Sequence, residues 1–226
     1  PLDRAEQAEA RAMLNRMLAA DIERAEVHDF HRADPRWKKS GRGRLFRSPT
    51  LFEDIIKTVT SCNVAWPSTI VMNRRLCEVF GRRSPSGGFA FPTAAKLARA
   101  KPATLRARCR VGYRDARIVE LARLFHRGHI DAAWLEHPDT PDEDVFVFLK
   151  SLPGIGPYAA ANIMQLLGRF SRLPLDTESL RHARAVLGMD GTDAQLMKRL
   201  TAHYEPFGRH KFRSYWFELW DFYESK

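Results

Sequence analysis

The sequence predicts an all-α fold, and three observations support this. Apolar residues recur at helical spacing along almost the whole chain, as in the stripe formed by Ile118, Leu121 and Phe125. Clusters of Gly, Pro and Ser interrupt these stripes where helices are expected to end. The segment V-F-V-F-L could form a strand by propensity, but together with its neighbours it fits the helical period. About ten helices are therefore expected.

The helices divide into three stretches. Residues 3–27 are rich in helix formers and predict one amphipathic helix. Residues 36–47 contain two glycines and six basic side chains, which predict a mobile basic loop that either forms a solvated face or contacts a nucleic-acid strand. Five of these side chains follow Trp37: Lys38, Lys39, Arg42, Arg44 and Arg47. Further helices are expected in residues 50–169 and 170–226, the latter ending in an aromatic-rich helix over 210–224.

Composition restricts the class of protein. A chain of 226 residues with 44% hydrophobic and 28% charged residues is typical of a globular protein with one large domain or two lobes. Lys and Arg exceed Asp and Glu by ten, which favours a polyanionic partner. No apolar run has the length of a membrane span and the first residues do not resemble a signal peptide. An intracellular location is expected, in the cytoplasm or nucleoid if the source is bacterial.

The cysteines and histidines do not suggest a metal centre. Cys62, Cys77 and Cys109 are far apart in the chain and cannot supply four thiolates to an iron–sulfur cluster or a structural zinc. They are expected to be buried free thiols. Four histidines are expected at the surface rather than on a metal: His126, His129, His203 and His210.

The most informative stretch is L-P-G-I-G-P-Y, residues 152–158, which lies between two apolar runs of helical spacing. Two helices joined by so short a turn need glycine, because the backbone bends sharply and exposes its amides. The amides of Gly154 and Gly156 would then lie at the positive end of the helix that begins near Pro157, where they can bind one phosphate without reading a base. An ordinary packing turn is the alternative.

Together with a second segment, this stretch resembles the helix–hairpin–helix superfamily of DNA glycosylases. L-P-G-I-G-P-Y-A-A-A-N is similar to the hairpin of that family, and L-P-L-D-T-E-S-L-R is similar to its catalytic segment. Asp176 matches the catalytic aspartate and Arg181 matches an arginine five residues later. The resemblance covers most of residues 50–226.

The resemblance implies an architecture of two helical lobes. Residues 50–169 would form a six-helix lobe that ends in the hairpin. Residues 170–226 would form the other lobe together with the N-terminal helix and basic loop of residues 1–49, and Asp176 would lie at the mouth of the cleft. The implied partner is double-stranded DNA that contains a damaged base, bound by a monomer away from any membrane.

Two departures from the family pattern narrow the implied chemistry. Members that also cleave the strand carry a lysine where this chain has Tyr158, and a phenol cannot form the required Schiff base. A monofunctional enzyme is therefore expected. No cysteine follows Cys109, so no iron–sulfur cluster is expected. A sodium or potassium ion on backbone carbonyls of the hairpin is the one ion that the resemblance implies, at Lys150, Leu152 and Ile155.

Candidate residues for each role follow from this pattern. Asp176 is the expected catalytic group, although it could serve only as a helix cap. Aromatic residues are expected to line a base pocket, although aromatic residues are more often core: Tyr158, Trp66 and Trp216, with Tyr215 as a further candidate. DNA contacts are expected from Asn63, Leu152, Pro153, Gly154, Ile155, Gly156 and Arg181.

The pocket composition favours one substrate class. Aromatic walls with few acid–base groups suit a cationic alkylated purine such as 3-methyladenine, which is already a good leaving group. Excision of an oxidised or deaminated base, such as 8-oxoguanine or uracil, is the second hypothesis. A DNA-binding module without catalysis is the third, and Asp176 argues against it, since phosphate binding gains nothing from a nearby carboxylate.

Overall fold

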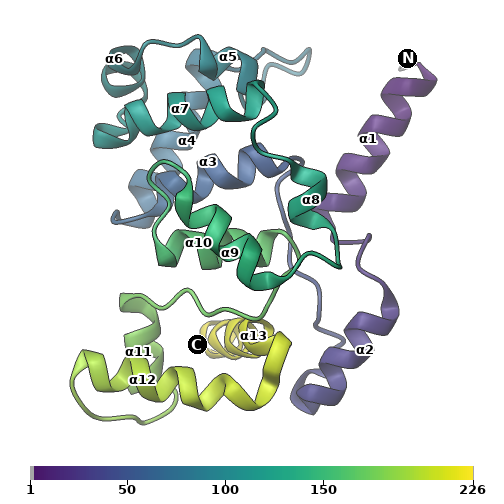
Figure 1. Cartoon of the computed structure of the whole chain (residues 1–226), viewed down its shortest axis with the longest axis vertical. Coiled ribbons are helices and arrows are strands. Elements are labelled where there is room, and N and C mark those ends of the chain that lie inside the picture. The colour runs from purple at the N-terminus through teal and green to yellow at the C-terminus, as the bar shows by residue number, and fades with distance from the viewer. Residues whose placement is uncertain (1–2, 226) are drawn as a thin grey trace. The chain divides into compact units, whose positions relative to one another are not determined.

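The structure is a computed structural model that describes residues 3–225 (Figure 1). In this range the backbone forms α-helices, short 3-10 helices and one π-helical turn, and no strand. The expected all-α fold is therefore confirmed, and V-F-V-F-L lies inside a helix, α9 (Asp142–Ser151). Among the described residues, no helix is both long and apolar enough to cross a membrane.

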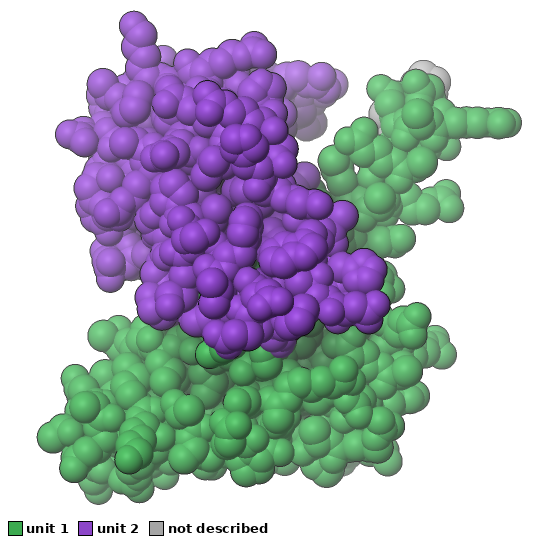
Figure 2. Space-filling model, viewed as in Figure 1, with its two compact units in different colours: residues 1–49, 160–226 green, residues 50–159 purple. Residues whose placement is uncertain are grey.

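The chain folds into two compact units (Figure 2). Unit 1 contains residues 1–49 and 160–226, and unit 2 contains residues 50–159. The N-terminal segment thus groups with the C-terminal helices. The second division falls inside a helix, α10 (Pro157–Leu166), ten residues before the boundary expected from the sequence.

Unit 2 contains a series of helices around an aliphatic core. Ile55, Leu76 and Ile118 are among its fully buried side chains. In chain order the elements are α3 (Leu51–Ser61), α4 (Trp66–Phe80), α5 (Ala94–Ala98), α6 (Pro102–Thr104), the π-turn Leu105–Cys109, the 3-10 turn Gly112–Arg114, α7 (Asp115–His126), α8 (Ala132–Glu136), α9 and α10. Residues 50–169 hold eight α-helices where the resemblance implied six, and three of the eight, α5, α6 and α8, have five residues or fewer.

Unit 1 starts with two helices where one was expected. α1 (Arg4–Met17) ends at Met17, and α2 (Arg24–Ala33) begins after a turn in which Ala19 has a φ of 50°. The prediction of a continuous helix over residues 3–27 is wrong, because the chain turns here to bury Ala19 and Ile22. The remaining elements are the 3-10 turn Pro35–Trp37, α11 (Thr177–Ala185), α12 (Asp193–Tyr204), the 3-10 segment Glu205–His210 and α13 (Lys211–Glu224).

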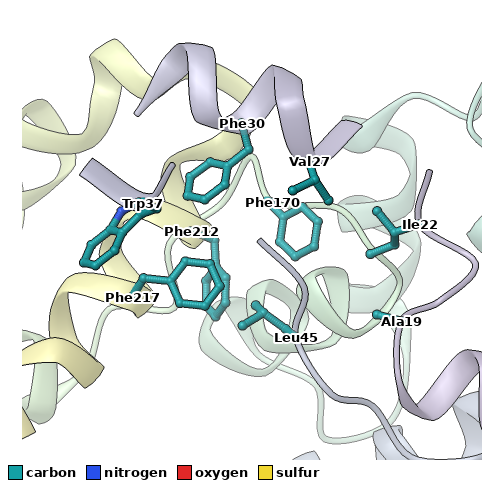
Figure 3. Close-up of a cluster of buried hydrophobic side chains, with 9 residues drawn as sticks. All are labelled: Ala19, Ile22, Val27, Phe30, Trp37, Leu45, Phe170, Phe212 and Phe217. Atoms are coloured by element: carbon teal, nitrogen blue, oxygen red, sulfur yellow. The ribbon is translucent and has the colours of Figure 1, made fainter. Parts of the chain in front are cut away.

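An aromatic cluster joins the N-terminal and C-terminal parts of unit 1 (Figure 3). The ring centres of Phe30 in α2 and Phe217 in α13 lie 5.8 Å apart. Phe170 stacks on Phe212 with 6.4 Å between ring centres. The fully buried Arg213 lies 3.8 Å above the ring of Phe170. Its guanidinium forms an ion pair of 2.8 Å with Glu26, which offsets part of the cost of burying its charge.

Arginines of the basic segment hold the chain in place. Arg42 forms ion pairs with Asp221 and Glu224 of α13, while Arg44 donates to the carbonyls of Ala19 at 3.1 Å and Ile22 at 2.8 Å. Arg47 is buried and bonds to the carboxylate of Asp21. Of these three side chains only Arg47 is buried, whereas Arg42 is half-buried and Arg44 is exposed. A strand contact by this segment stays a prediction. Lys38 and Lys39 are exposed.

One of the four histidines lies in the interior. His210 is buried and its Nε2 lies 2.9 Å from Oδ2 of Asp29, so the expectation of a surface position is wrong for it. The residue is the N-cap of α13, and its ring centre lies 5.6 Å from that of the buried Phe30. Among the cysteines, Cys109 is buried as expected, whereas Cys62 and Cys77 are half-buried. Burial raises the pKa of the Cys109 thiol to about 11.

Candidate functional site

The hairpin of residues 152–156 connects α9 to α10. Leu152 and Ile155 are buried and the amide of Ile155 donates to the carbonyl of Leu152 at 3.1 Å, so the apolar residues anchor the turn in unit 2. Pro153 is half-buried between them. Gly154 has a φ of +79°, and a Cβ atom there would lie 2.6 Å from Cδ of Arg117. Both the conformation and the close contact explain why this position is glycine.

The two glycines expose their amides in front of a helix. Gly154 and Gly156 are exposed, and neither amide has a hydrogen-bond acceptor among the described residues. Both precede Pro157, the first residue of α10, where the helix dipole adds positive potential. This arrangement can bind one phosphate group through backbone donors.

Carbonyl groups of the same hairpin are the expected ligands of a monovalent cation. The Leu152 carbonyl accepts one hydrogen bond from Ile155 and keeps a second lone pair. Lys150 belongs to the last turn of α9, whose carbonyls lack helical partners. These features fit a sodium or potassium ion. The ion itself, and the role of the Ile155 carbonyl as its third ligand, stay predictions. Within residues 3–225, no group of three or more His, Cys, Asp or Glu side chains could hold a metal ion.

Asp176 is the N-cap of α11 in unit 1. Its Oδ1 accepts from the amide of Ser179 at 3.0 Å and from the hydroxyl of Ser179 at 3.2 Å. The amide of Asp176 donates in return to Oγ of Ser179 at 3.2 Å, which completes a capping box. Asp176 is half-buried, and no donor within residues 3–225 reaches its Oδ2. The carboxylate thus caps the helix with one oxygen and keeps the other for a further partner.

Two buried hydrogen-bond networks start from side chains of α11, the helix that Asp176 caps. Ser179 lies 3.0 Å from the hydroxyl of Tyr215, and both side chains are buried. One turn further along α11, His182 contacts the hydroxyl of Tyr204 at 2.9 Å and Oε1 of Glu218 at 3.0 Å. Burial tends to raise the pKa of Glu218. Hydrogen bonds from His182, Tyr204 and Arg36 outweigh burial and lower this pKa to about 2.

Trp216 lines a pocket in unit 1. The pocket has a volume of about 320 Å³. Trp216 stacks on Phe212 at 5.7 Å and meets Trp220 edge-on at 5.8 Å, so its ring orientation is fixed from both sides. The pocket is lined by Arg42, Arg44, Leu45, Phe46, Gln165, Trp216, Phe217, Trp220 and Glu224. A cavity with indole walls of this size can hold a planar heterocycle. Tyr215, by contrast, is buried and directs its hydroxyl to Ser179.

The other expected pocket residues belong to unit 2. Trp66 begins α4 and is 69% exposed, so the alternative that it is a core residue is wrong. Tyr158 lies in the first turn of α10 and is half-buried. Asn63 is exposed and adopts a left-handed φ of 51° at the break between α3 and α4.

A buried arginine fixes that break. Arg114 donates to the carbonyl of Val59 at 3.1 Å and to the carbonyl of Cys62. The last carbonyls of α3 thus obtain partners from the segment before α7, and the turn that carries Asn63 and Trp66 is held rigidly.

Arg181 lies on the surface of α11 in contact with two of its neighbours. Its guanidinium forms a two-pronged ion pair with Glu178, with the shortest distance at 2.6 Å, and lies 4.9 Å above the ring of Tyr223. A DNA contact by Arg181 would therefore compete with, or be oriented by, this carboxylate.

Sequence reasoning missed two residues that hold the candidate site residues in place, Arg114 and Ser179. Arg114 gives no local signal, because its acceptors are carbonyls more than fifty residues earlier. Ser179 could have been noticed, since a serine three residues after an N-cap aspartate can close a capping box. Its contact with Tyr215 spans 36 residues and has no signature in the sequence.

Comparisons with known proteins identify the fold. No protein-family model matches the chain. No curated protein matches it by sequence either. Several solved structures share its architecture, among them three DNA glycosylases.

The 8-oxoguanine glycosylase/lyase of Clostridium acetobutylicum in complex with DNA has a TM-score of 0.73 at 18% identity, and the match covers 98% of this chain and 77% of that one. The 3-methyladenine DNA glycosylase of Archaeoglobus fulgidus has a TM-score of 0.73 at 22% identity, with coverage of 98% and 77%. The 3-methyladenine DNA glycosylase of Schizosaccharomyces pombe, in complex with abasic DNA, has a TM-score of 0.63 at 20% identity, with coverage of 93% and 95%. This chain therefore has the all-α fold of the helix–hairpin–helix DNA glycosylases.

Proposed function

We propose that this chain, which has the fold of the DNA glycosylases, hydrolyses the N-glycosidic bond of a damaged base in duplex DNA. The observation that carries the proposal is the state of Asp176. The carboxylate is held by two donors on Oδ1, while Oδ2 has no partner among the described residues. A cap needs only one oxygen, so the second is available for chemistry. The chain's location would then be intracellular, where its DNA substrate is found.

The proposed reaction needs a carboxylate that is held in position and has one oxygen available. Cleavage of an N-glycosidic bond develops positive charge on the sugar, as in other glycoside hydrolyses. A fixed carboxylate oxygen stabilises this charge and orients or deprotonates the attacking water. In this proposal Oδ2 of Asp176 has that role, and the bonds to Ser179 hold it in position.

DNA binding in this proposal uses backbone and side-chain donors. The amides of Gly154 and Gly156 would bind one phosphate at the start of α10, which contributes affinity for any sequence. Asn63 and Arg181 would add side-chain contacts, and Leu152, Pro153 and Ile155 would shape the hairpin. The excess of ten positive charges favours association with the polyanion.

The proposed substrate is an alkylated purine of the 3-methyladenine type. A target base leaves the stack at a cost of a few kcal/mol and needs a pocket that recognises it. We propose that the cavity with the indole of Trp216 in its wall is this pocket, because an electron-rich ring favours a cationic base. Tyr158 and the exposed Trp66 are the further aromatic groups proposed to contact the base or fill its place.

The proposed enzyme is monofunctional and leaves an abasic site without strand cleavage. Tyr158 occupies the position at which strand-cleaving relatives have a lysine, according to the resemblance of the hairpin. Without an amine there, a covalent imine with the sugar cannot form. The proposal includes no redox cofactor and no iron–sulfur cluster.

An oxidised or deaminated base is the second candidate substrate. One of the similar structures is an 8-oxoguanine glycosylase/lyase, and its TM-score equals that of the archaeal 3-methyladenine enzyme. A non-catalytic DNA-binding module is the third candidate, and the open oxygen of Asp176 argues against it.

One assay separates these candidates. Duplexes that contain a single 3-methyladenine, 7-methylguanine, 8-oxoguanine or uracil are incubated with the protein and analysed with and without alkali. The proposal expects cleavage only after alkali and only for the alkylated duplexes. Cleavage of the 8-oxoguanine duplex alone would favour the second candidate, and duplex binding without any excision would favour the third.

A further inference from the structure

We propose that the hydroxyl of Tyr215, acting through Ser179, positions the carboxylate of Asp176. This inference rests on the proposed function and adds a positioning residue from a different helix, α13, to the site. Tyr215 does not touch the substrate in this account. Its hydroxyl lies 3.0 Å from Oγ of Ser179, which lies 3.2 Å from Oδ1 of Asp176.

The one proton and two lone pairs of the Ser179 hydroxyl determine which group donates in each bond. The single hydroxyl proton of Ser179 is donated to Oδ1 of Asp176. Oγ of Ser179 already accepts from the amide of Asp176, and its second lone pair faces Tyr215. Either hydroxyl could donate in the bond between Ser179 and Tyr215, but a carboxylate oxygen can only accept. We therefore infer that the proton of Ser179 points at Asp176 and that Tyr215 donates to Ser179.

The position of Tyr215 is rigid. The residue is 3% exposed, and its ring meets the ring of His182 edge-on at 5.5 Å and that of Tyr204 edge-on at 5.6 Å between ring centres. Aromatic contacts of this kind restrict the ring to one orientation, so the hydroxyl is held at Ser179 without further loss of entropy. The orientation of the Asp176 carboxylate is thus set by the packing of α13 against α11.

Capping alone does not explain this arrangement. An N-cap aspartate requires one donor, the amide of the third helical residue, which Ser179 already provides at 3.0 Å. The hydroxyl chain adds a second donor to the same oxygen and none to Oδ2. Its effect is to fix the rotation of the carboxylate and to direct Oδ2 away from the cap. Such control matters when a specific oxygen has to meet the sugar, because catalytic groups must be held close to their productive geometry.

The test compares two tyrosines of the same cluster. Tyr215→Phe removes the hydroxyl that reaches Ser179. Tyr204→Phe is the matched control, since Tyr204 is also buried but donates to Glu218 at 2.6 Å. Excision is measured under single turnover with enzyme in excess on a methylated duplex, and affinity is measured on a duplex with the neutral tetrahydrofuran abasic analogue.

The expected result separates rate from binding. Tyr215→Phe should lower the single-turnover rate about fivefold, which corresponds to one hydrogen bond, with affinity for the tetrahydrofuran duplex unchanged. Ser179→Ala should lower the rate roughly tenfold or more, since it removes the donor itself. Tyr215→Phe should cause no further loss in the Ser179→Ala background, because it acts through that hydroxyl. Tyr204→Phe should lower the melting temperature but keep the wild-type rate.

A second readout does not depend on turnover. A duplex with a pyrrolidine abasic analogue carries a positive charge that imitates the sugar in the transition state. Tyr215→Phe should weaken binding to this duplex about fivefold relative to the tetrahydrofuran duplex, and Tyr204→Phe should not. If Tyr215→Phe kept both the wild-type excision rate and the wild-type affinity for the pyrrolidine duplex, the inference would be overturned and the proposed function would stand. A wild-type protein that excises no base would overturn the proposed function and this inference with it.

Discussion

The hydroxyl and the amide of Ser179 both donate to Oδ1 of Asp176, at 3.2 Å and 3.0 Å. The candidate catalytic carboxylate is therefore also the cap of α11, and the two roles use different oxygens. Variants at this position can separate them, because an asparagine caps a helix about as well as an aspartate but carries no charge.

Asp176→Asn should keep the fold and the affinity for DNA while it loses base excision. The asparagine oxygen can still accept from Ser179, so the melting temperature should change by no more than a few degrees. Affinity for an undamaged duplex should stay within about twofold, since the proposed phosphate donors are elsewhere. Thermal denaturation and a binding titration check both expectations.

The control for that variant is Asp176→Ala, which removes cap and charge together. It should destabilise the protein by about 1 kcal/mol relative to Asp176→Asn. A loss of duplex affinity in Asp176→Asn that parallels a loss of stability would contradict the account and assign Asp176 a structural role only.

The two hairpin glycines should respond differently to substitution. Gly154→Ala should lower the free energy of unfolding by about 1–2 kcal/mol, because the residue has a φ of +79° and a Cβ would lie 2.6 Å from Arg117. Gly156→Leu should leave stability unchanged, since a Cβ at Gly156 has no neighbour within 4 Å. Urea unfolding measures both.

Duplex affinity tests the function of the same glycine. Gly156→Leu should weaken binding to all duplexes alike by roughly tenfold, because the side chain would keep a phosphate from the exposed amides. Unchanged affinity in Gly156→Leu would refute the phosphate-binding role of the hairpin. Weaker binding to damaged duplexes only would indicate that the hairpin contacts the lesion.

The identity of Tyr158 predicts the absence of a covalent intermediate. Incubation with a substrate duplex and sodium borohydride should give no protein–DNA adduct, since the phenol cannot form an imine. A strand-cleaving glycosylase serves as the positive control in the same gel. A stable adduct would show that another amine of the chain acts as nucleophile, and the protein would then be bifunctional.

The buried network around Glu218 predicts a pH dependence of stability. The pKa of this carboxyl is about 2, below its ordinary value of 4.5, so its ionised form stabilises the fold above pH 4.5 and this contribution is lost as the pH falls from 4.5 towards 2. Glu218→Gln should lower the free energy of unfolding at neutral pH by roughly 2 kcal/mol. The difference from wild type should shrink below pH 4.5, as measured by urea unfolding at several pH values. A difference that stays constant down to pH 2 would refute the assignment.

Local sequence signals predicted much of the fold and the centre of the site. The Gly and Pro residues of the hairpin specify a sharp turn, and the structure has it at residues 152–156. Asp176 has the features of an N-cap, and it caps α11. The roles of these residues in DNA binding and catalysis stay predictions, since geometry alone does not test them.

Features that depend on contacts distant in sequence could not be predicted. The turn after Met17 follows from the burial of Ala19 and Ile22 in a cluster with residues near 212 and 217. Helix propensity in that stretch favours continuation, and tertiary packing outweighs it. The bond between Ser179 and Tyr215 likewise depends on how α13 packs on α11. For Trp66 the sequence left a pocket role and a core position open, and the structure excludes the core position.

The most direct test of the account is release of the free base. Wild-type protein and Asp176→Asn are incubated under single turnover with duplex DNA treated with a methylating agent, and the soluble fraction is analysed by mass spectrometry. We expect wild type to release 3-methyladenine or 7-methylguanine with intact strands before alkali, and Asp176→Asn to release at least about a thousandfold less, as expected when a group that stabilises the transition state is removed. Equal release by the two proteins, or no release by either, would contradict the central claim.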